Sequence, residues 1–381
     1  MGGVLCVLIV GDGMADGPVA ALGGKTPLAY GPYPHLARLA GQSGVRMACT
    51  TPKGFSPGTE VAMPLIAGYD TDVLTGRGPV EAAGMGVALA PGQFAMRTNL
   101  VALDDADRLR EACPELSDEE GLAAGRLLAA DAGIRALLDG AGWMLHPQPG
   151  FRQMLTGDGP PPNGMIPPHN VSGARLADHL PEGALEAFVT RGRILLRESG
   201  LGVWPWGAGV VPRYQPFAER FGRRGTVISA VPVVRGMARL AGMEAPEVPG
   251  ATGTLRTDWR AKVAATLAAA WAGCDFVMLH LEAPDDCSHA KDLPGKRRAI
   301  DMLDQMTGLL LEGLADFPAF RAGLISDHVT SVETGRHGDA PVPWCVFDSR
   351  LPTGTPTVFA ERGDAPAEHW SAPLRTLLAL S

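Results

Sequence analysis

Short apolar runs alternate with amphipathic segments near both ends of the chain. Val4–Val10 is apolar throughout and rich in β-branched residues, which is typical of a central strand that is covered on both faces. The apolar run at Leu324-Ile325 is too short for a helix and also indicates a buried strand. Further strands are expected at 225–230 and 275–281, and helical spacing is found at 35–41, 59–66, 233–241, 258–272 and 294–314. The alternation predicts an α/β core, in which a parallel sheet carries helices on both faces.

This alternation stops in the middle of the chain. From about residue 100 the sequence predicts an acidic helix at 104–120 and further helices at 123–138 and 184–198. Residues 147–168 are rich in proline and glycine, and Trp204–Gly209 has the composition of a loop. We therefore expect a core domain made of 1–89 and 223–381, interrupted by a smaller inserted domain at 90–222.

Composition and charge narrow the class of protein. The chain has 381 residues, 19% of them charged, and its net charge of −8 comes without a large basic face, which argues against a nucleic-acid partner. No apolar run approaches the length of a membrane span, so no membrane partner is expected. The six cysteines form no Cys-x-x-Cys pair, and Cys6, Cys274 and Cys345 lie in or beside apolar runs, as in a reduced cytoplasmic protein.

Polar residues of the metal-binding kind follow three of the predicted strands. Asp12 comes after the first strand, Asp285 and His289 after 275–281, and Asp327, His328 and His337 after Leu324-Ile325. A single carboxylate in such a place is usually part of a turn. Several aspartates and histidines after several strands are hard to explain as turns, and they favour a metal site at the carboxyl edge of the sheet.

A hydroxyl group completes this candidate set. The turn at Pro57-Gly58 places Thr59 at the start of a helix, where an N-cap is the simplest role and an anion would also bind favourably. Seven ligands exceed what one tetrahedral metal with an open position needs, and they suit the two metals of a phosphoryl transfer. Beside such a metal, the Thr59 hydroxyl would be activated as a nucleophile that forms a phosphothreonine. Arg77, between two glycines, is a candidate clamp for phosphate or carboxylate.

Taken together, the motifs resemble the cofactor-independent phosphoglycerate mutases of the archaeal type, within the alkaline phosphatase superfamily. The resemblance covers nearly the whole chain and rests on the motifs Gly11–Met14, Pro57–Ala62, Gly68–Asp70, Thr75–Pro79, Ala283–Asp285, His289, Ser326–His328 and His337. It implies an alkaline phosphatase-like core with an inserted α/β domain and a small phosphorylated substrate. It also implies two divalent cations, Mn²⁺, Zn²⁺ or Mg²⁺. One would be held by Asp285, His289 and His337, and the other by Asp12, Thr59, Asp327 and His328. Arg77, Arg152 and His169 are our candidates for substrate contact.

The chain departs from that family at several positions. Thr59 stands where the family commonly has serine, and Met63 stands where mutases commonly have histidine. The segment Glu81–Gly86 resembles a sister group of homoserine kinase-like phosphotransferases. Three hypotheses therefore stand: a phosphoglycerate mutase, a phosphotransferase or phosphatase for another small hydroxyl compound, and a non-catalytic binding protein on a phosphatase scaffold.

Overall fold

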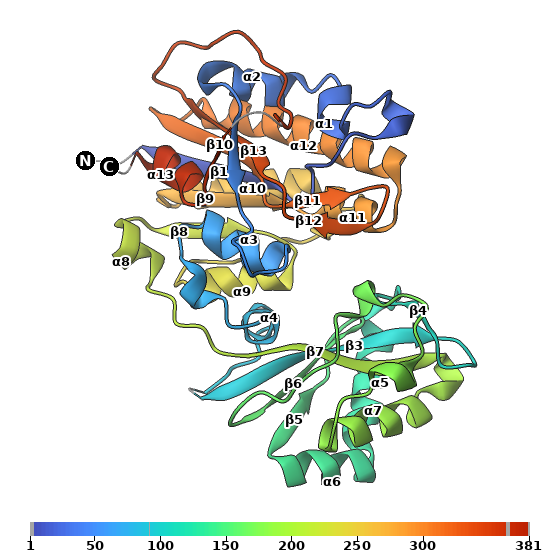
Figure 1. Cartoon of the computed structure of the whole chain (residues 1–381). Coiled ribbons are helices and arrows are strands. Elements are labelled where there is room, and N and C mark those ends of the chain that lie inside the picture. The colour runs from blue at the N-terminus through green and yellow to red at the C-terminus, as the bar shows by residue number, and fades with distance from the viewer. Residues whose placement is uncertain (1–3, 91, 363–365, 380–381) are drawn as a thin grey trace. The chain divides into compact units, whose positions relative to one another are not determined.

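The computed structural model describes residues 4–90, 92–362 and 366–379, and the chain divides into two compact units (Figure 1). The core unit contains the residues up to Leu74 and from Tyr214 onward, and the second unit is Thr75–Arg213. The sequence placed the inserted domain at 90–222, so both borders lie earlier in the structure. The first border lies before helix α4 (Arg77–Met85), because this helix packs on the sheet of the second unit.

The core unit is built on a seven-stranded sheet with the order β14-β2-β13-β10-β1-β9-β8. Its strands are β1 (Leu5–Gly11), β2 (Arg46–Cys49), β8 (Gly225–Ile228), β9 (Phe276–Leu281), β10 (Phe320–Ser326), β13 (Val342–Asp348) and β14 (Ala367–His369). The neighbours β8, β9, β1 and β10 are parallel, as the alternation predicted. Strand β13, which was not predicted, runs antiparallel to both β10 and β2. It can do so because only the small hairpin of β11 (Val329–Ser331) and β12 (Arg336–Gly338) separates it from β10, with no crossover helix.

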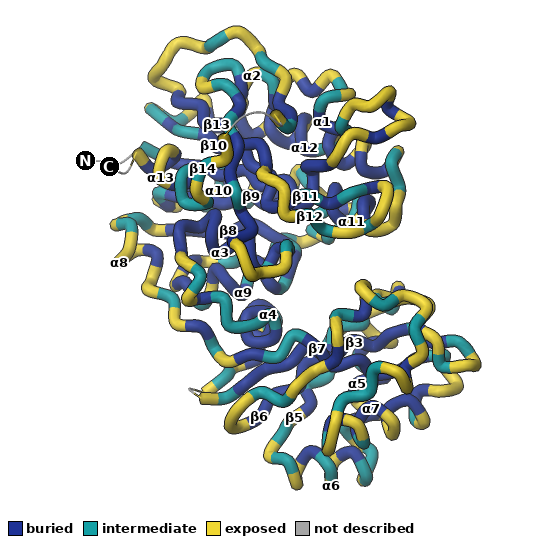
Figure 2. The backbone as a smooth tube through the Cα atoms, viewed as in Figure 1, coloured by how far each residue is buried: buried dark blue, intermediate teal, exposed yellow. Residues whose placement is uncertain are grey.

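Helices cover both faces of this sheet, as expected for the α/β class. The helices of the core unit are α1 (Pro27–Tyr30), α2 (Pro34–Ser43), α3 (Thr59–Ile66), α8 (Phe217–Phe221), α9 (Pro232–Leu240), α10 (Trp259–Trp271), α11 (Ala283–His289), α12 (Leu293–Leu314) and α13 (Ala372–Leu378). Val7 and Ile9 of β1 belong to one apolar cluster with Leu303 of α12. Cys6 points to the other face, where its Sγ donates to the Leu377 carbonyl of α13. Figure 2 shows the central strands β9 and β10 largely buried.

The second unit is an antiparallel sheet between helices. Its strands are β3 (Gln93–Leu103), β4 (Leu109–Glu111), β5 (Trp143–His146), β6 (Arg152–Asp158) and β7 (Leu201–Val210), and its helices besides α4 are α5 (Asp118–Ala130), α6 (Ala132–Ala141) and α7 (Ala184–Leu195). Successive residues of a strand point to opposite faces. Accordingly, Phe94 packs with Phe188 of α7, whereas Ala95 packs with Ala82 of α4.

Two helix predictions in this unit were wrong. The acidic segment 104–120 is helical only from Asp118, where Ser117 and Glu120 form a reciprocal capping box that starts α5. The single helix expected at 123–138 is two helices, because the Asp131 carboxylate accepts from the Ile134 N–H and starts α6.

Two expected loops also contain strands. Trp204–Gly209 lies within β7, and β6 lies inside the irregular stretch 147–168. Both strands pair with β3, and β6 also pairs with β5, so tertiary pairing overrides the local composition.

Two expectations from composition can also be checked. Cys6, Cys274 and Cys345 are buried free thiols, as predicted. Among the described residues, none of the helices is long and apolar enough to cross a membrane.

Candidate metal centre

Three adjacent strand ends form the floor of the candidate site. Gly11, the last residue of β1, lies opposite Leu281 of β9 on one side and Ser326 of β10 on the other. The three strands are parallel and end at one level, so the residues that follow them emerge at the same edge of the sheet.

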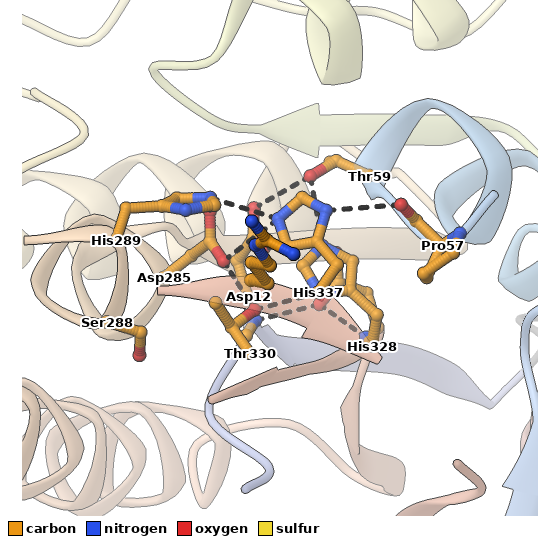
Figure 3. A network of polar contacts seen from close by, with 12 residues as sticks. Asp12, Pro57, Thr59, Asp285, Ser288, His289, His328, Thr330 and His337 are labelled. Carbon is orange, nitrogen blue, oxygen red and sulfur yellow. Dashed lines mark hydrogen bonds and ion pairs between the residues drawn. The ribbon is translucent and has the colours of Figure 1, made fainter. Parts of the chain in front are cut away.

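The seven predicted ligands come from the segments that follow these strands and from two neighbours. Asp12 follows β1, Asp327 and His328 follow β10, and α11, after β9, carries Asp285 and His289. His337 comes from β12, and Thr59 is the first residue of α3. The structure brings all seven together, and it arranges six of them in two groups of three with Thr59 beside one group (Figure 3).

The first group is Asp285, His289 and His337. His289 Nε2 lies 3.2 Å from Asp285 Oδ2, and His337 Nε2 lies 3.5 Å from Asp285 Oδ1. The two Nε2 atoms are 3.0 Å apart. Asp285 and His289 share one face of α11 because they are four residues apart.

The second group is Asp12, Asp327 and His328, all of them buried. His328 Nε2 lies 3.3 Å from Asp12 Oδ1 and 3.3 Å from Asp327 Oδ2. Thr59 Oγ1 lies 3.4 Å from the same Nε2 and 3.3 Å from Asp12 Oδ2. The threonine hydroxyl is therefore the fourth polar group around this point.

Both groups fit a divalent cation. Asp12 Oδ1 and Asp327 Oδ2 are buried and make no hydrogen bond, which is costly for a carboxylate unless it is paired or bound to a metal. Burial, and then the charges of Asp327 and Asp285, hold the pKa of Asp12 well above its usual range, and a cation would oppose that shift. Ligands about 2.0–2.2 Å from a tetrahedral cation lie about 3.3–3.6 Å apart, close to most of the distances in both groups.

Hydrogen bonds to backbone carbonyls fix the histidine tautomers of the first group. His289 Nδ1 lies 2.8 Å from the Gly335 carbonyl oxygen, and His337 Nδ1 lies 3.1 Å from that of Pro57. A carbonyl only accepts, so each Nδ1 carries the proton and donates it. In the neutral imidazole, each Nε2 then presents a lone pair to the centre, which is the arrangement expected of metal-binding histidines.

The histidines of the two groups have opposite pKa shifts. Burial lowers the pKa of His289, but the hydrogen bond and charge of Asp285 outweigh it and raise that pKa to about 9. The pKa of His337 is raised by the same balance. Burial lowers the pKa of His328, and the nearby carboxylates do not reverse that shift. Protons therefore compete with a cation mainly in the first group.

Some residues of the site were not predicted from the sequence. His280 Nε2 lies 3.0 Å from Asp12 Oδ2, and its Nδ1 lies 3.0 Å from Ser229 Oγ. A lone histidine in the apolar strand 276–281 was the available signal, because such a residue is seldom buried without a partner. Thr330, which lies between the two groups, had no comparable signal.

The three candidate substrate residues lie in the second unit, in or beside a cluster of arginines around a buried glutamate. Glu81 of α4 is fully buried, and its Oε1 accepts from Arg97 Nη1 at 2.9 Å and from Arg77 Nη2 at 3.2 Å. Burial raises the pKa of Glu81, but the charges of Arg97, Arg77 and Arg152 outweigh it, and the pKa is lowered. Two guanidinium groups thus bond to one carboxylate, and the charge of a third, that of Arg152, acts on it as well.

Tryptophan 206 connects this cluster to His169. The His169 ring lies 5.6 Å from the Trp206 ring, and Arg77 and Arg97 lie 5.4 Å and 4.9 Å from the centroid of the same ring. The structure therefore groups Arg77 and His169 around one indole. Arg152 stacks on Phe151 at 4.3 Å.

Comparison with known proteins gives the class first. The Metalloenzyme superfamily matches residues 5–365, so the chain belongs to this superfamily of metal-binding enzymes. The candidate ligand groups agree with divalent-metal binding.

Closer relatives give the family. The probable 2,3-bisphosphoglycerate-independent phosphoglycerate mutase of Geobacter sulfurreducens is 35% identical over 361 residues, which are 90% of each chain. The 2,3-bisphosphoglycerate-independent phosphoglycerate mutase 2 of Methanothermobacter thermautotrophicus is 36% identical over 369 residues, 90% of this chain and 88% of the relative. The chain belongs to the family of 2,3-bisphosphoglycerate-independent phosphoglycerate mutases, and the resemblance stated from its motifs is confirmed.

Solved structures share the fold. A Pyrococcus horikoshii protein superposes with a TM-score of 0.77 at 24% identity, covering 100% of this chain and 99% of the other. The cofactor-independent phosphoglycerate mutase of Thermoplasma acidophilum superposes with a TM-score of 0.58 at 21% identity, covering 99% of each chain. These similarities extend over both units.

Proposed function

We propose that this chain interconverts 2- and 3-phosphoglycerate without added 2,3-bisphosphoglycerate, through a phosphothreonine on Thr59. The observation that carries the proposal is the position of Thr59 Oγ1, 3.3 Å from Asp12 Oδ2 and 3.4 Å from His328 Nε2, beside one of the two ligand groups. Membership in a family of named mutases supports the choice of substrate.

Two divalent cations belong to this proposal. Asp285, His289 and His337 would hold one, and Asp12, Asp327, His328 and Thr59 the other. Two such cations supply positive charge for the attacking and leaving oxygens of an in-line displacement, and they lower the pKa of a bound hydroxyl. Manganese, zinc and magnesium each accept oxygen and imidazole ligands, so the ligand set leaves the choice among them to metal analysis.

The residues perform two successive transfers. Thr59 Oγ loses its proton and attacks phosphorus, the bond from phosphorus to the glycerate oxygen breaks, and that oxygen takes up a proton. The other hydroxyl of glycerate then loses a proton and attacks the phosphorus of the phosphothreonine. The bond from phosphorus to Thr59 Oγ breaks and Oγ takes up a proton, which leaves the phosphate on the neighbouring carbon of glycerate. Splitting the reaction in this way replaces one difficult transfer by two easier ones, with no net consumption of water.

We propose Arg77, Arg152 and His169 as contacts for the anionic substrate. Guanidinium groups bind carboxylate and phosphate through paired hydrogen bonds. Three arginines against one buried glutamate leave the cluster positively charged, which suits phosphoglycerate better than a zwitterionic acceptor such as homoserine.

The test is a mutase assay with matched variants. Wild type is given 3-phosphoglycerate and Mn²⁺ without bisphosphoglycerate, and 2-phosphoglycerate is expected to form. Thr59→Ala should lower the rate by at least about 10³-fold, because it removes the nucleophile, whereas Thr59→Ser should stay active. Thr266→Ala removes another buried hydroxyl, one that donates to the Lys262 carbonyl, and should leave the rate unchanged.

The same assay separates the alternatives. Acid quenching with substrate labelled in its phosphate should leave label on wild type and none on Thr59→Ala. Release of free phosphate alone would replace the mutase by a phosphatase. Transfer to homoserine, in place of interconversion, would favour the homoserine kinase-like phosphotransferase. Full activity of Thr59→Ala would remove the phosphothreonine from the mechanism.

A further inference from the structure

Thr330 lies between the two ligand groups and contacts both. Its Oγ1 is 2.6 Å from Asp285 Oδ1 of the first group and 3.0 Å from His328 Nδ1 of the second (Figure 3). On the β11–β12 hairpin, Thr330 also pairs directly with His337. Thr330 therefore belongs to neither group but bonds to a member of each.

The single proton of the Thr330 hydroxyl determines the direction of both hydrogen bonds. A carboxylate oxygen only accepts, so Thr330 Oγ1 donates its proton to Asp285. The contact with His328 must then run the other way, with Nδ1–H donating to Thr330 Oγ1. His328 is thereby held as the tautomer whose Nε2 lone pair faces Asp12 and Asp327.

Thr330 is itself held in place by buried groups. Its N–H donates to the Ala15 carbonyl at 3.0 Å, and its carbonyl accepts from Lys296 Nζ at 2.6 Å. Lys296 is paired at 2.8 Å with Asp16, so its charge is balanced. The backbone of Thr330 therefore has little freedom to move its hydroxyl.

The surroundings leave no room for a substitute. A Cβ added at Gly13 would lie 2.5 Å from both Thr330 Oγ1 and Asp285 Oδ1, so the space there is already filled. Thr330 has no exposed surface. A water molecule cannot take over both contacts if the hydroxyl is replaced by a methyl group of the same size.

We infer that Thr330 is a positioning residue shared by both metal sites, which orients Asp285 in one and fixes the tautomer of His328 in the other. The inference rests on the two-metal centre of the proposed function, and it assigns to one hydroxyl the alignment of two sites. Removing a group that hydrogen-bonds to metal ligands typically weakens metal binding by about 10–100-fold.

The test measures metal binding without substrate. The full chain is stripped with chelator and titrated with Mn²⁺ by calorimetry, with electron paramagnetic resonance to count bound ions. Thr330→Val should weaken both sites by about 10-fold or more, and Thr330→Ser, which keeps the hydroxyl, should restore both. Thr307→Val is the control, because it removes a buried hydroxyl that donates to the Leu303 carbonyl on α12, and both affinities should stay at the wild-type value.

A second readout needs only wild-type protein. In the stripped chain labelled with ¹⁵N-histidine, the His328 signal, assigned by its loss in His328→Gln, should have the Nδ1–H tautomer. An Nε2–H tautomer would overturn the inference, even if Thr330→Val did not fold. So would a folded Thr330→Val that binds Mn²⁺ as wild type does, or that weakens one site and leaves the other unchanged. Neither readout contains phosphoglycerate, so failure of the mutase assay and failure of this inference are separate results.

Discussion

The buried Glu81 in the arginine cluster allows a quantitative test of how the second unit is held together. Its side chain has no exposed surface and accepts from Arg97 and Arg77 on one oxygen. Glu81→Gln keeps the shape and removes the charge, which leaves the buried Arg97 and the partly buried Arg77 and Arg152 without their carboxylate. Breaking a buried ion pair by removing one partner costs about 3–5 kcal/mol, and the remaining amide oxygen favours the lower end of that range.

The measurement must report the stability of each unit separately. A single melting temperature averages over both, since a chain of two units need not unfold in one step. Hydrogen exchange read peptide by peptide gives the opening free energy of β3 and β6 separately from that of β1 and β9. We expect Glu81→Gln to lower protection in β3 and β6 by about 3 kcal/mol, or roughly 150-fold in exchange rate, and to leave β1 and β9 unchanged.

An exposed ion pair supplies the control. Glu247 pairs with Arg235 at 2.8 Å, but the Glu247 side chain is 80% exposed, so Glu247→Gln should change protection little. The pH dependence supplies a second check. The folded pKa of Glu81 is lowered from 4.5, so its stabilisation is fully present above about pH 4.5 and is lost as the pH falls through the folded pKa. Unchanged protection of β3 in Glu81→Gln at neutral pH would refute the view that this carboxylate holds the cluster together.

Four further predictions concern the metal centre and its support. The pKa of His289 is raised to about 9 and that of His337 is also raised, so protons compete with Mn²⁺ for these side chains. The affinity of the stripped chain for Mn²⁺ should therefore increase from pH 6.5 to 9, and binding should release protons, which calorimetry in two buffers measures. A pH-independent affinity would contradict this prediction. In the stripped chain these raised values stabilise the fold fully below pH 6.5, and the melting temperature should fall as the pH rises through about 9. Chelation should abolish mutase activity and lower the unfolding free energy by about 2.7 kcal/mol for each cation that had been present at 100 times its Kd, with recovery on adding metal back. Lys296→Met should lower the free energy of unfolding by denaturant by about 3–5 kcal/mol, because it leaves Asp16 buried without its ion-pair partner. If this reason is correct, adding Asp16→Asn should restore part of the lost stability. A Lys296→Met variant as stable as wild type would exclude it.

The sequence could single out the candidate ligands, which the structure brings together, because their signal is local. A buried parallel strand is an apolar run, and an aspartate or histidine directly after it stands out, as Asp12 and Asp327 do. The helix that begins at Thr59 could be predicted from the turn at Pro57-Gly58, and it begins at that residue in the structure. The strand β13 could not be predicted in the same way, since its direction depends on which edge of the sheet the chain returns to.

The groups around the ligands could not be predicted, and the reason is physical. Thr330 is two residues from His328 in the chain, but its contact with Asp285 depends on how the β11–β12 hairpin meets α11. His280 reaches Asp12 only because β9 and β1 pair in one particular register. A sequence pattern records which side chains a segment can offer, whereas a hydrogen bond between segments depends on the register of the folded sheet.

The candidate metal centre depends on the register of β1 with β9 and β10, so it can form only in the folded core unit. The ligands span positions 12 to 337, so they meet only when β1, β9 and β10 are aligned with Gly11 between Leu281 and Ser326. A shift of one residue in either pairing would turn the strand-end side chains to the opposite face of the sheet. The apolar cluster of β1 and α12 fixes that alignment, because it has to bury Val7 and Ile9 on one face. The same packing that stabilises the core therefore sets the distances among the candidate ligand atoms.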